Sequence, residues 1–248
     1  MIFEENTPMD MVIHPIAYML SPFPDKFGIP RQADLVKEIK GTIVFEPAYR
    51  KEGILKGMEA FSHLWLIWGF SESPRNEWSP LVRPPKLGGN ETRGVFATRS
   101  PIRPNPLGLS AVKIIAIRND PKLGMVIDVS GNDLMDKTPI FDIKPYLPYA
   151  DAIPEALQGF APDPAPTLEP VIPPPWDLKI PVIEIPAVKA ILAQDPRPGY
   201  QHDETREYGF YYQGLNIRFK VEDEKRIVVT DVEPILPDKK GMLKTPSH

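Results

Sequence analysis

The segment FSHLWLIWGF, residues 61–70, says most about the fold of this chain. Apolar and aromatic residues occupy both its odd and its even positions, so a strand formed here is covered on both faces. Its apolar core is also far shorter than the roughly 20 residues that a membrane-spanning helix requires. We therefore predict a central, buried strand over Phe61–Phe70.

Short runs typical of strands lie on both sides of this segment. The candidates are residues 41–45, 94–98, 110–117, 125–129 and 140–143, with turn-forming residues at 87–90, 118–121 and 131–133. Short strands separated by turns favour a closed barrel or a sandwich. The 32 prolines among 248 residues argue against a helical bundle, because proline interrupts helices.

A proline-rich stretch divides the chain. Residues 162–186 contain nine prolines in 25 positions, which predicts a stiff connector with neither strand nor helix. Beyond it, we expect a helix over Ala187–Gln194 and paired strands over Leu215–Val221 and Arg226–Val232. The predicted fold is mainly β: a small β-barrel domain (1–160), the connector (161–186) and a small α+β C-terminal domain (187–248).

The composition restricts the chemistry and the compartment. The chain has no cysteine, which excludes disulfides, thiolate nucleophiles and cysteine-ligated zinc. The first residues, MIFEEN, lack the basic end and apolar run of a signal peptide. We expect a soluble cytoplasmic protein with no membrane segment and no metal.

Positive charge is concentrated in one window of an otherwise acidic chain. Residues 83–103 contain five Arg or Lys residues and one acid, although the whole chain carries a net charge of −4. Prolines stiffen this window and glycines permit close approach of a ligand, so it is a candidate anion or phosphate site. A solvated basic loop is the alternative. Further basic residues could contact RNA phosphates or simply be solvated: Lys37, Lys40, Arg50, Lys51, Arg197, Arg206 and Arg218.

A segment that begins inside this window and extends beyond it resembles a known family. GVFATRSPIRPNPLG, residues 94–108, resembles the signature of the TsaA-like (TrmO) family. Other segments resemble the family's remaining motifs in order: residues 27–32 (FGIPRQ), 57–66, 83–90, 133–139 and 142–151. Residues 192–200 (LAQDPRPGY) resemble the C-terminal region of bacterial members.

The resemblance implies a small β-barrel that binds S-adenosylmethionine, and a homodimer with the cofactor near the subunit interface. It also implies N6-methylation of threonylcarbamoyladenosine at position 37 of tRNA, chiefly threonine tRNA. The cofactor contacts that it implies are Arg31, Gln32, Ser71, Glu72, Arg99, Leu109, Ser130, Gly131, Asn132 and Asp133. Ser71-Glu72 departs from the His-Gln that many bacterial members have at this position.

Elementary chemistry assigns roles within this set. Arg99 or Arg103 can hold a carboxylate or phosphate with its guanidinium fork, or can instead pair with Asp136 or Asp142 inside the fold. Candidates for accepting the adenine N6 proton are Asp133, Asp136 and Tyr18, although residues 131–133 also fit a simple turn. Candidate substrate contacts are Arg103, Asn105 and Lys144.

Two other functions stay open. A barrel that binds RNA or a nucleoside without chemistry would bind RNA independently of S-adenosylmethionine. A methyltransferase for another substrate would bind the cofactor but leave threonine tRNA unmodified. A hydrolase is disfavoured, because the sequence contains neither G-x-S-x-G nor H-E-x-x-H.

Overall fold

The structure, a computed structural model, describes residues 11–72, 78–84, 91–160, 167–197, 203 and 205–235. The described part is mainly β, as predicted. Its strands are β1 (Ala17–Leu20), β2 (Lys40–Phe45), β3 (His63–Gly69), β4 (Leu81–Val82), β5 (Arg93–Gly94), β6 (Leu107–Asp120), β7 (Gly124–Ser130), β8 (Pro139–Pro145), β9 (Glu169–Val171), β10 (Tyr208–Tyr212), β11 (Leu215–Glu222) and β12 (Arg226–Pro234). Its helices are α1 (Pro148–Asp151), α2 (Ile185–Ala193) and the short 3-10 turns η1 (Pro47–Tyr49), η2 (Met58–Ala60), η4 (Val95–Ala97), η5 (Trp176–Lys179) and η6 (Val182–Glu184).

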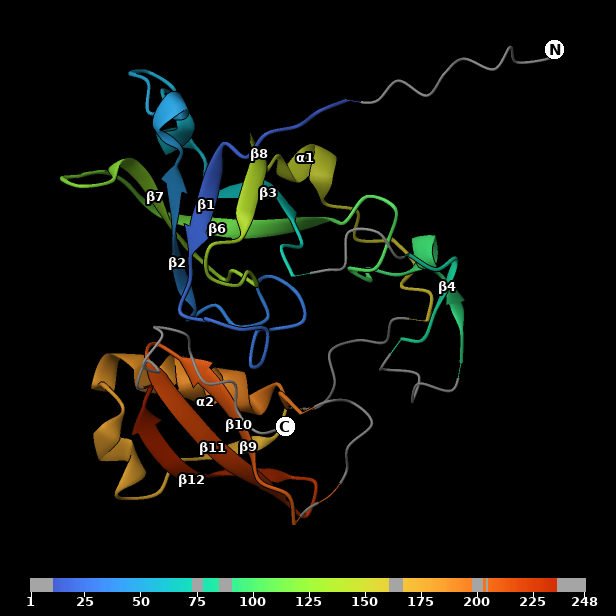
Figure 1. Ribbon diagram of the computed structural model, residues 1–248, viewed down its shortest axis with the longest axis vertical. Coiled ribbons are helices and arrows are strands. Elements are labelled where there is room, and N and C mark those ends of the chain that lie inside the picture. The colour runs from blue at the N-terminus through green and yellow to red at the C-terminus, as the bar shows by residue number, and fades with distance from the viewer. Residues whose placement is uncertain are drawn as a thin grey trace.

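Six strands of the N-terminal part close into a ring. Their order is β1-β2-β7-β6-β3-β8, and β8 pairs back onto β1. Every pairing in the ring is antiparallel (Figure 1). The predicted central strand is confirmed, because β3 hydrogen-bonds to β6 on one side and to β8 on the other.

The interior of the ring is filled by alternate residues of these strands. On β1, Ala17 and Met19 are fully buried, so the intervening Tyr18 faces outward. On β3, Leu64, Leu66 and Trp68 point inward and belong to the same apolar core. The end of the ring at which β3 ends and β6 begins therefore has the Trp68 indole inside it.

One predicted strand is wrong. Residues 94–98 form only the end of the two-residue strand β5, and Val95–Ala97 form a 3-10 turn. The turn is closed by the Thr98 hydroxyl and backbone N–H, which donate to the Val95 carbonyl at 2.8 and 3.1 Å. This local side-chain hydrogen bond competes with strand pairing.

The prediction that residues 162–186 contain neither strand nor helix is also wrong. Strand β9 pairs in parallel with β12 and completes a second sheet of order β10-β11-β12-β9. Pro170 is tolerated there because β9 is an edge strand, where a missing N–H costs no ladder bond. Turns η5 and η6 follow, and Ile180 is buried with α2 against this sheet. We call residues 167–235 the C-terminal module.

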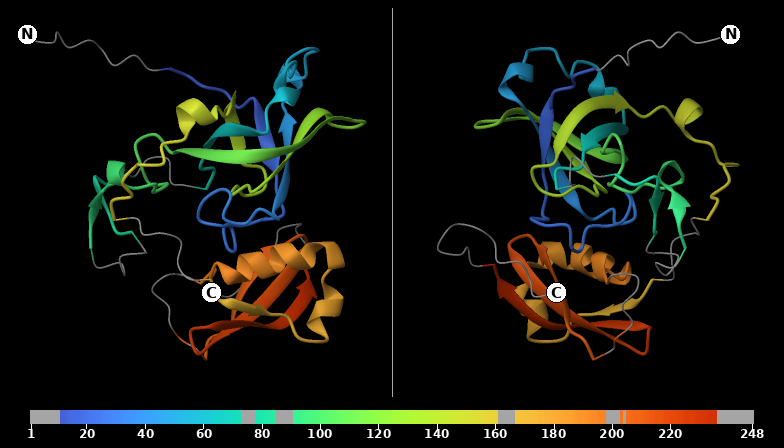
Figure 2. Two further views of the ribbon diagram at one scale, coloured as in Figure 1. Left: turned by 180° about the vertical axis from the view of Figure 1, so that it is seen from behind. Right: turned by 45° about the vertical axis from the view of Figure 1, so that its right-hand side comes forward.

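The loop between β1 and β2, residues 21–39, reaches from the ring to the C-terminal module. Its apolar side chains Phe23, Val36 and Ile39 are buried in the core of that module rather than in the ring. Figures 1 and 2 show this loop at the end of the ring that faces α2 and β10. The loop that carries Arg31 and Gln32 is thus shared by both parts of the fold.

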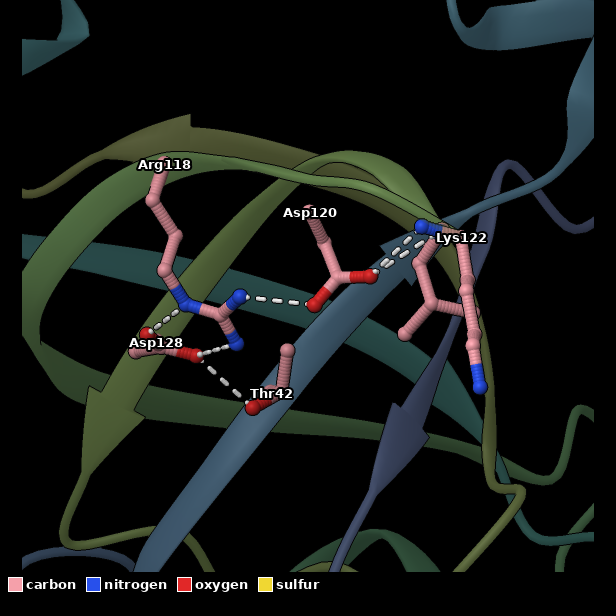
Figure 3. Close-up of polar contacts among 6 residues, drawn as sticks. Thr42, Arg118, Asp120, Lys122 and Asp128 are labelled. Carbon is pink, nitrogen blue, oxygen red and sulfur yellow. Dashed lines mark hydrogen bonds and ion pairs between the residues drawn. The ribbon is translucent and has the colours of Figure 1, made fainter.

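A polar network braces the outer surface of the ring. Arg118 on β6 donates to Asp128 on β7 at 2.6 Å and to Asp120 at 2.8 Å (Figure 3). Thr42 on β2 donates to the same Asp128 carboxylate at 2.8 Å. The network therefore joins three neighbouring strands. No helix in the described ranges has the length and apolar character needed to cross a membrane.

Candidate functional site

Asp133 is the centre of a polar group at the end of the ring where Trp68 lies. The Trp68 Nε1–H donates to Ser110 Oγ at 2.9 Å, and the Ser110 hydroxyl donates to Asp133 Oδ1 at 2.6 Å. The backbone N–H groups of Ala33 and of Asp133 itself lie close enough to the carboxylate to favour its charged form. The position of Asp133 is therefore fixed from β3, from β6 and from the loop 21–39.

Burial gives Asp133 an unusual acidity. Desolvation raises the pKa of its carboxyl above the ordinary value, while the bonds from Ser110 and the backbone and the nearby charge of Arg99 act in the opposite direction. A carboxylate with a raised pKa is a better proton acceptor near neutral pH than an exposed one. Asp133 thus combines a fixed geometry with increased basicity.

Arg99, a cationic residue of the signature segment 94–108, lies near Asp133. It donates to the Gln32 side-chain oxygen, and Gln32 in turn donates to the Arg31 carbonyl. The segment that carries Arg99 is held by Arg103, whose guanidinium donates to the Thr98 carbonyl at 3.0 Å. The fold thus brings the pair Arg31-Gln32 together with Arg99 and Asp133, which lie far from it in the sequence.

The residues before Asp133 connect the ring to the loop 21–39. The Gly131 N–H donates to the Ile39 carbonyl at 2.9 Å, and the Gly131 carbonyl accepts from the Asp34 N–H at 2.8 Å. Asn132 is 1% exposed, with its side chain near Met19 and Gly41 inside the ring. Ser130 ends β7 and is half-buried. Residues 131–133, expected to form a turn, instead form a bend at Gly131, where φ is +73°, followed by irregular backbone that positions Asp133.

Several predicted site residues lie apart from this group. Ser71 and Glu72 are exposed in the turn after β3. The Leu109 side chain is exposed on β6, where alternation directs it away from the inward-facing Ser110. Asn105 is exposed, and Lys144 faces outward opposite Trp65, paired with Asp142 at 2.8 Å. Their predicted contacts with cofactor or substrate stay predictions.

The three proton-acceptor candidates are not equivalent. Tyr18 faces outward from β1, because Ala17 and Met19 on either side of it fill the core. Asp136 accepts the Ser21 backbone N–H at 3.0 Å, which holds the start of the loop 21–39. Only Asp133 has the Trp68–Ser110 support and lies beside Arg99. The alternative in which Asp142 pairs with Arg99 or Arg103 is not realised, since Asp142 pairs with Lys144.

Residues that the sequence analysis did not single out support the site. Ser110 is a buried polar residue on a strand whose other inward positions are apolar, such as Val112, and that break in the pattern was a usable signal. By contrast, Arg197, which the sequence offers as a possible contact with RNA phosphates, is 5% exposed and is paired with Asp195. Arg197 is therefore not an accessible phosphate contact.

The group fits the ligand that the family resemblance implies. S-adenosylmethionine presents a carboxylate, an amine, ribose hydroxyls and a sulfonium. The Arg99 guanidinium suits the carboxylate, and the Asp133 carboxylate suits an amine or hydroxyl donor. Within the described ranges, histidine and acidic side chains form no cluster of three that could ligate a metal.

Fold and site together define a class: a two-part, mainly β protein with a group of arginine, glutamine and aspartate side chains at one end of a ring of strands. The family model for the tRNA-methyltransferase O N-terminal domain matches residues 18–152, and the model for the TrmO C-terminal domain matches residues 185–235. The chain belongs to the TrmO family.

Individual relatives agree with this assignment. The tRNA (adenine(37)-N6)-methyltransferase of Escherichia coli K12 is 36% identical over 220 residues, covering 84% of this chain and 92% of that protein. A Pseudomonas aeruginosa protein named "Putative S-adenosylmethionine-dependent methyltransferase RcsF" is 38% identical over 234 residues, covering 89% of this chain and 96% of that protein. The crystal structure of TrmO from P. aeruginosa matches 93% of this chain and 100% of its own, with a TM-score of 0.74 and 33% sequence identity.

Proposed function

We propose that this protein is an S-adenosylmethionine-dependent tRNA methyltransferase that modifies N6 of threonylcarbamoyladenosine at position 37, chiefly in threonine tRNA. The observation that carries the proposal is the Arg99–Gln32–Asp133 group in a chain of the TrmO family. The activities for which the E. coli and P. aeruginosa relatives are named support the adenine-37 and cofactor parts of the proposal. The threonylcarbamoyl group and the tRNA species are the finer part of the proposal.

The residues of the group divide the chemistry between them. Bound S-adenosylmethionine supplies the methyl group. Arg99 holds the ligand carboxylate, and Gln32 keeps the Arg99 side chain oriented. Asp133 accepts a hydrogen bond from the cofactor or receives the proton that leaves N6. Holding both reactants in line supplies several kcal/mol of the barrier reduction without any covalent intermediate.

The rest of the proposal concerns the oligomeric state and the domain boundaries. The closed ring of strands supports the small β-barrel that the resemblance implies. We propose a cytoplasmic homodimer in which the first 160 residues form the barrel domain and residues 187–248 the C-terminal domain, with the segment 161–186 contributing β9 to the latter. Exposed residues outside the group, Asn105 among them, are candidates for contact with RNA.

The proposal is tested by incubating the protein with methyl-labelled S-adenosylmethionine, with and without total tRNA from cells that lack their own enzyme. Label in the tRNA supports the methyltransferase. Cofactor binding without transfer to any tRNA favours a different substrate. RNA binding without affinity for S-adenosylmethionine contradicts the proposal and favours a non-catalytic RNA-binding protein.

A further inference from the structure

The loop 21–39 rests on the C-terminal module through close apolar contacts. The Phe23 and Tyr212 rings meet edge to face, with centroids 5.4 Å apart. Gly28 approaches Phe210 so closely that a Cβ would lie 2.7 Å from its Cδ2 atom. The backbone path of this loop, and hence the position of Arg31 and Gln32, is set by β10 of the module.

Two polar contacts complete this interface. The Gln213 backbone N–H donates to the Pro22 carbonyl at 3.0 Å. The Arg31 Nη2 group donates to the Arg197 carbonyl at 3.4 Å. The second contact joins the C-terminal module directly to the segment that holds Gln32 against Arg99.

The Arg197 carbonyl is held in place by an internal clamp. The Asp195 carboxylate accepts three hydrogen bonds from Arg197: from its backbone N–H at 3.3 Å, from Nε at 2.8 Å and from Nη2 at 2.8 Å. Arg197 is 5% exposed. Because the side chain and the backbone N–H of Arg197 bind the same Asp195 carboxylate, the backbone after α2 is held in one conformation.

We infer that Arg197 is a positioning residue for the cofactor site: clamped by Asp195, it presents the carbonyl that holds Arg31. Through Arg31, the loop 21–39 keeps Gln32 beside Arg99 and the Ala33 N–H on the Asp133 carboxylate. This role rests on the proposed function. It makes the C-terminal module a part of the cofactor site, although Arg197 itself does not reach the ligand.

The test measures S-adenosylmethionine affinity by calorimetry on the full chain. Arg197→Lys keeps the charge but loses the planar fork that matches the Asp195 carboxylate. We expect the dissociation constant to rise about tenfold, the size expected for one charged hydrogen bond. Arg226→Lys is the matched control, since Arg226 lies in the same module but is exposed, with ion pairs of 3.6 and 3.9 Å.

Asp195→Asn, which leaves the side-chain volume unchanged, should weaken binding in the same direction and covers the case in which Arg197→Lys fails to fold. In an Arg31→Ala background, Arg197→Lys should have little further effect, because the two residues act through one contact. Folded Arg197→Lys and Asp195→Asn proteins with unchanged affinity, or a fully additive double variant, overturn the inference. Wild-type protein that binds no S-adenosylmethionine would contradict the proposed function instead.

Discussion

Gly108 on β6 lies directly against the indole of Trp68 on the neighbouring strand β3. A Cβ on Gly108 would lie 2.7 Å from Trp68 Cδ2 and closer still to Cε2. The indole could not keep this position beside any other residue, and it is this position that lets Nε1 reach Ser110. A glycine of the signature segment therefore supports Asp133 through Trp68 and Ser110.

Gly108→Ala should disturb both stability and cofactor binding. Displacing the packed indole should lower the free energy of unfolding by about 1–3 kcal/mol, as overpacked cores do. Loss of the Trp68–Ser110 bond should also weaken S-adenosylmethionine binding. Urea denaturation and calorimetry measure the two effects.

Gly94→Ala is the control for this change. Gly94 lies in the same signature segment, but nothing stands within 4 Å of a Cβ added there. It should leave both quantities unchanged. Equal behaviour of the two alanine variants would contradict the role assigned to Gly108.

Arg99→Ala should remove the cation that holds the ligand carboxylate. A lost charge-assisted hydrogen bond raises the dissociation constant of S-adenosylmethionine by roughly ten- to a hundredfold. The control is Arg93→Ala, because Arg93 pairs with Glu91 at 2.7 Å in the same basic window. If both variants bind the cofactor like wild type, Arg99 is not a ligand contact.

Asp133→Asn should change how stability depends on pH. Burial raises the pKa of the Asp133 carboxyl, so the folded state binds more protons than the unfolded state between the ordinary and the raised value. The free energy of unfolding of the wild type therefore loses a contribution as pH rises through that window. Asparagine does not titrate and avoids this loss.

The stability of Asp133→Asn relative to wild type should thus increase as pH rises from about 3 towards neutrality. Denaturation curves at a series of pH values measure this difference. A difference that stays constant with pH would show that the carboxyl is not destabilised by burial.

The stability of Arg118→Gln relative to wild type should fall as pH rises, which is the opposite of the trend expected for Asp133→Asn. Hydrogen bonds from Arg118 lower the pKa of Asp120. At Asp128, burial raises the pKa, but the hydrogen bonds from Arg118 and Thr42 outweigh it, so the pKa is lowered overall. The network therefore stabilises the fold above the ordinary aspartate pKa and loses this effect as pH falls.

The wild type should accordingly melt at a higher temperature than Arg118→Gln near neutral pH. The gap should narrow in acid and at high salt, because the pairs are partly exposed. Cofactor affinity should not change, since this network braces the outer surface of the ring. A gap that is insensitive to both pH and salt would argue against an electrostatic origin.

The sequence predicted the elements that depend on a local pattern and missed those that depend on contacts between distant residues. Residues 61–70 predicted β3 because burial on both faces leaves a continuous apolar pattern. Strand β9 escaped prediction because it has three residues, one of them proline, and exists only through pairing with β12. The Arg99–Gln32 contact joins residues 67 positions apart, which no local pattern reveals.

Resemblance to the family motifs assigned Gln32 and Arg99 to one cofactor site, and the structure places them in contact. The resemblance did not indicate the residues that hold this site in place. Ser110 was detectable as a polar break in an apolar pattern, but the Arg197–Asp195 clamp was not, because a surface arginine and a buried one look alike in sequence.

The most direct test of the central claim is nucleoside mass spectrometry after reaction with labelled S-adenosylmethionine. Threonine tRNA that carries threonylcarbamoyladenosine is compared with the same tRNA lacking that modification. The account predicts one methyl group on N6 of residue 37, in the modified tRNA alone. Methylation of both tRNAs, at another position, or of neither would contradict it.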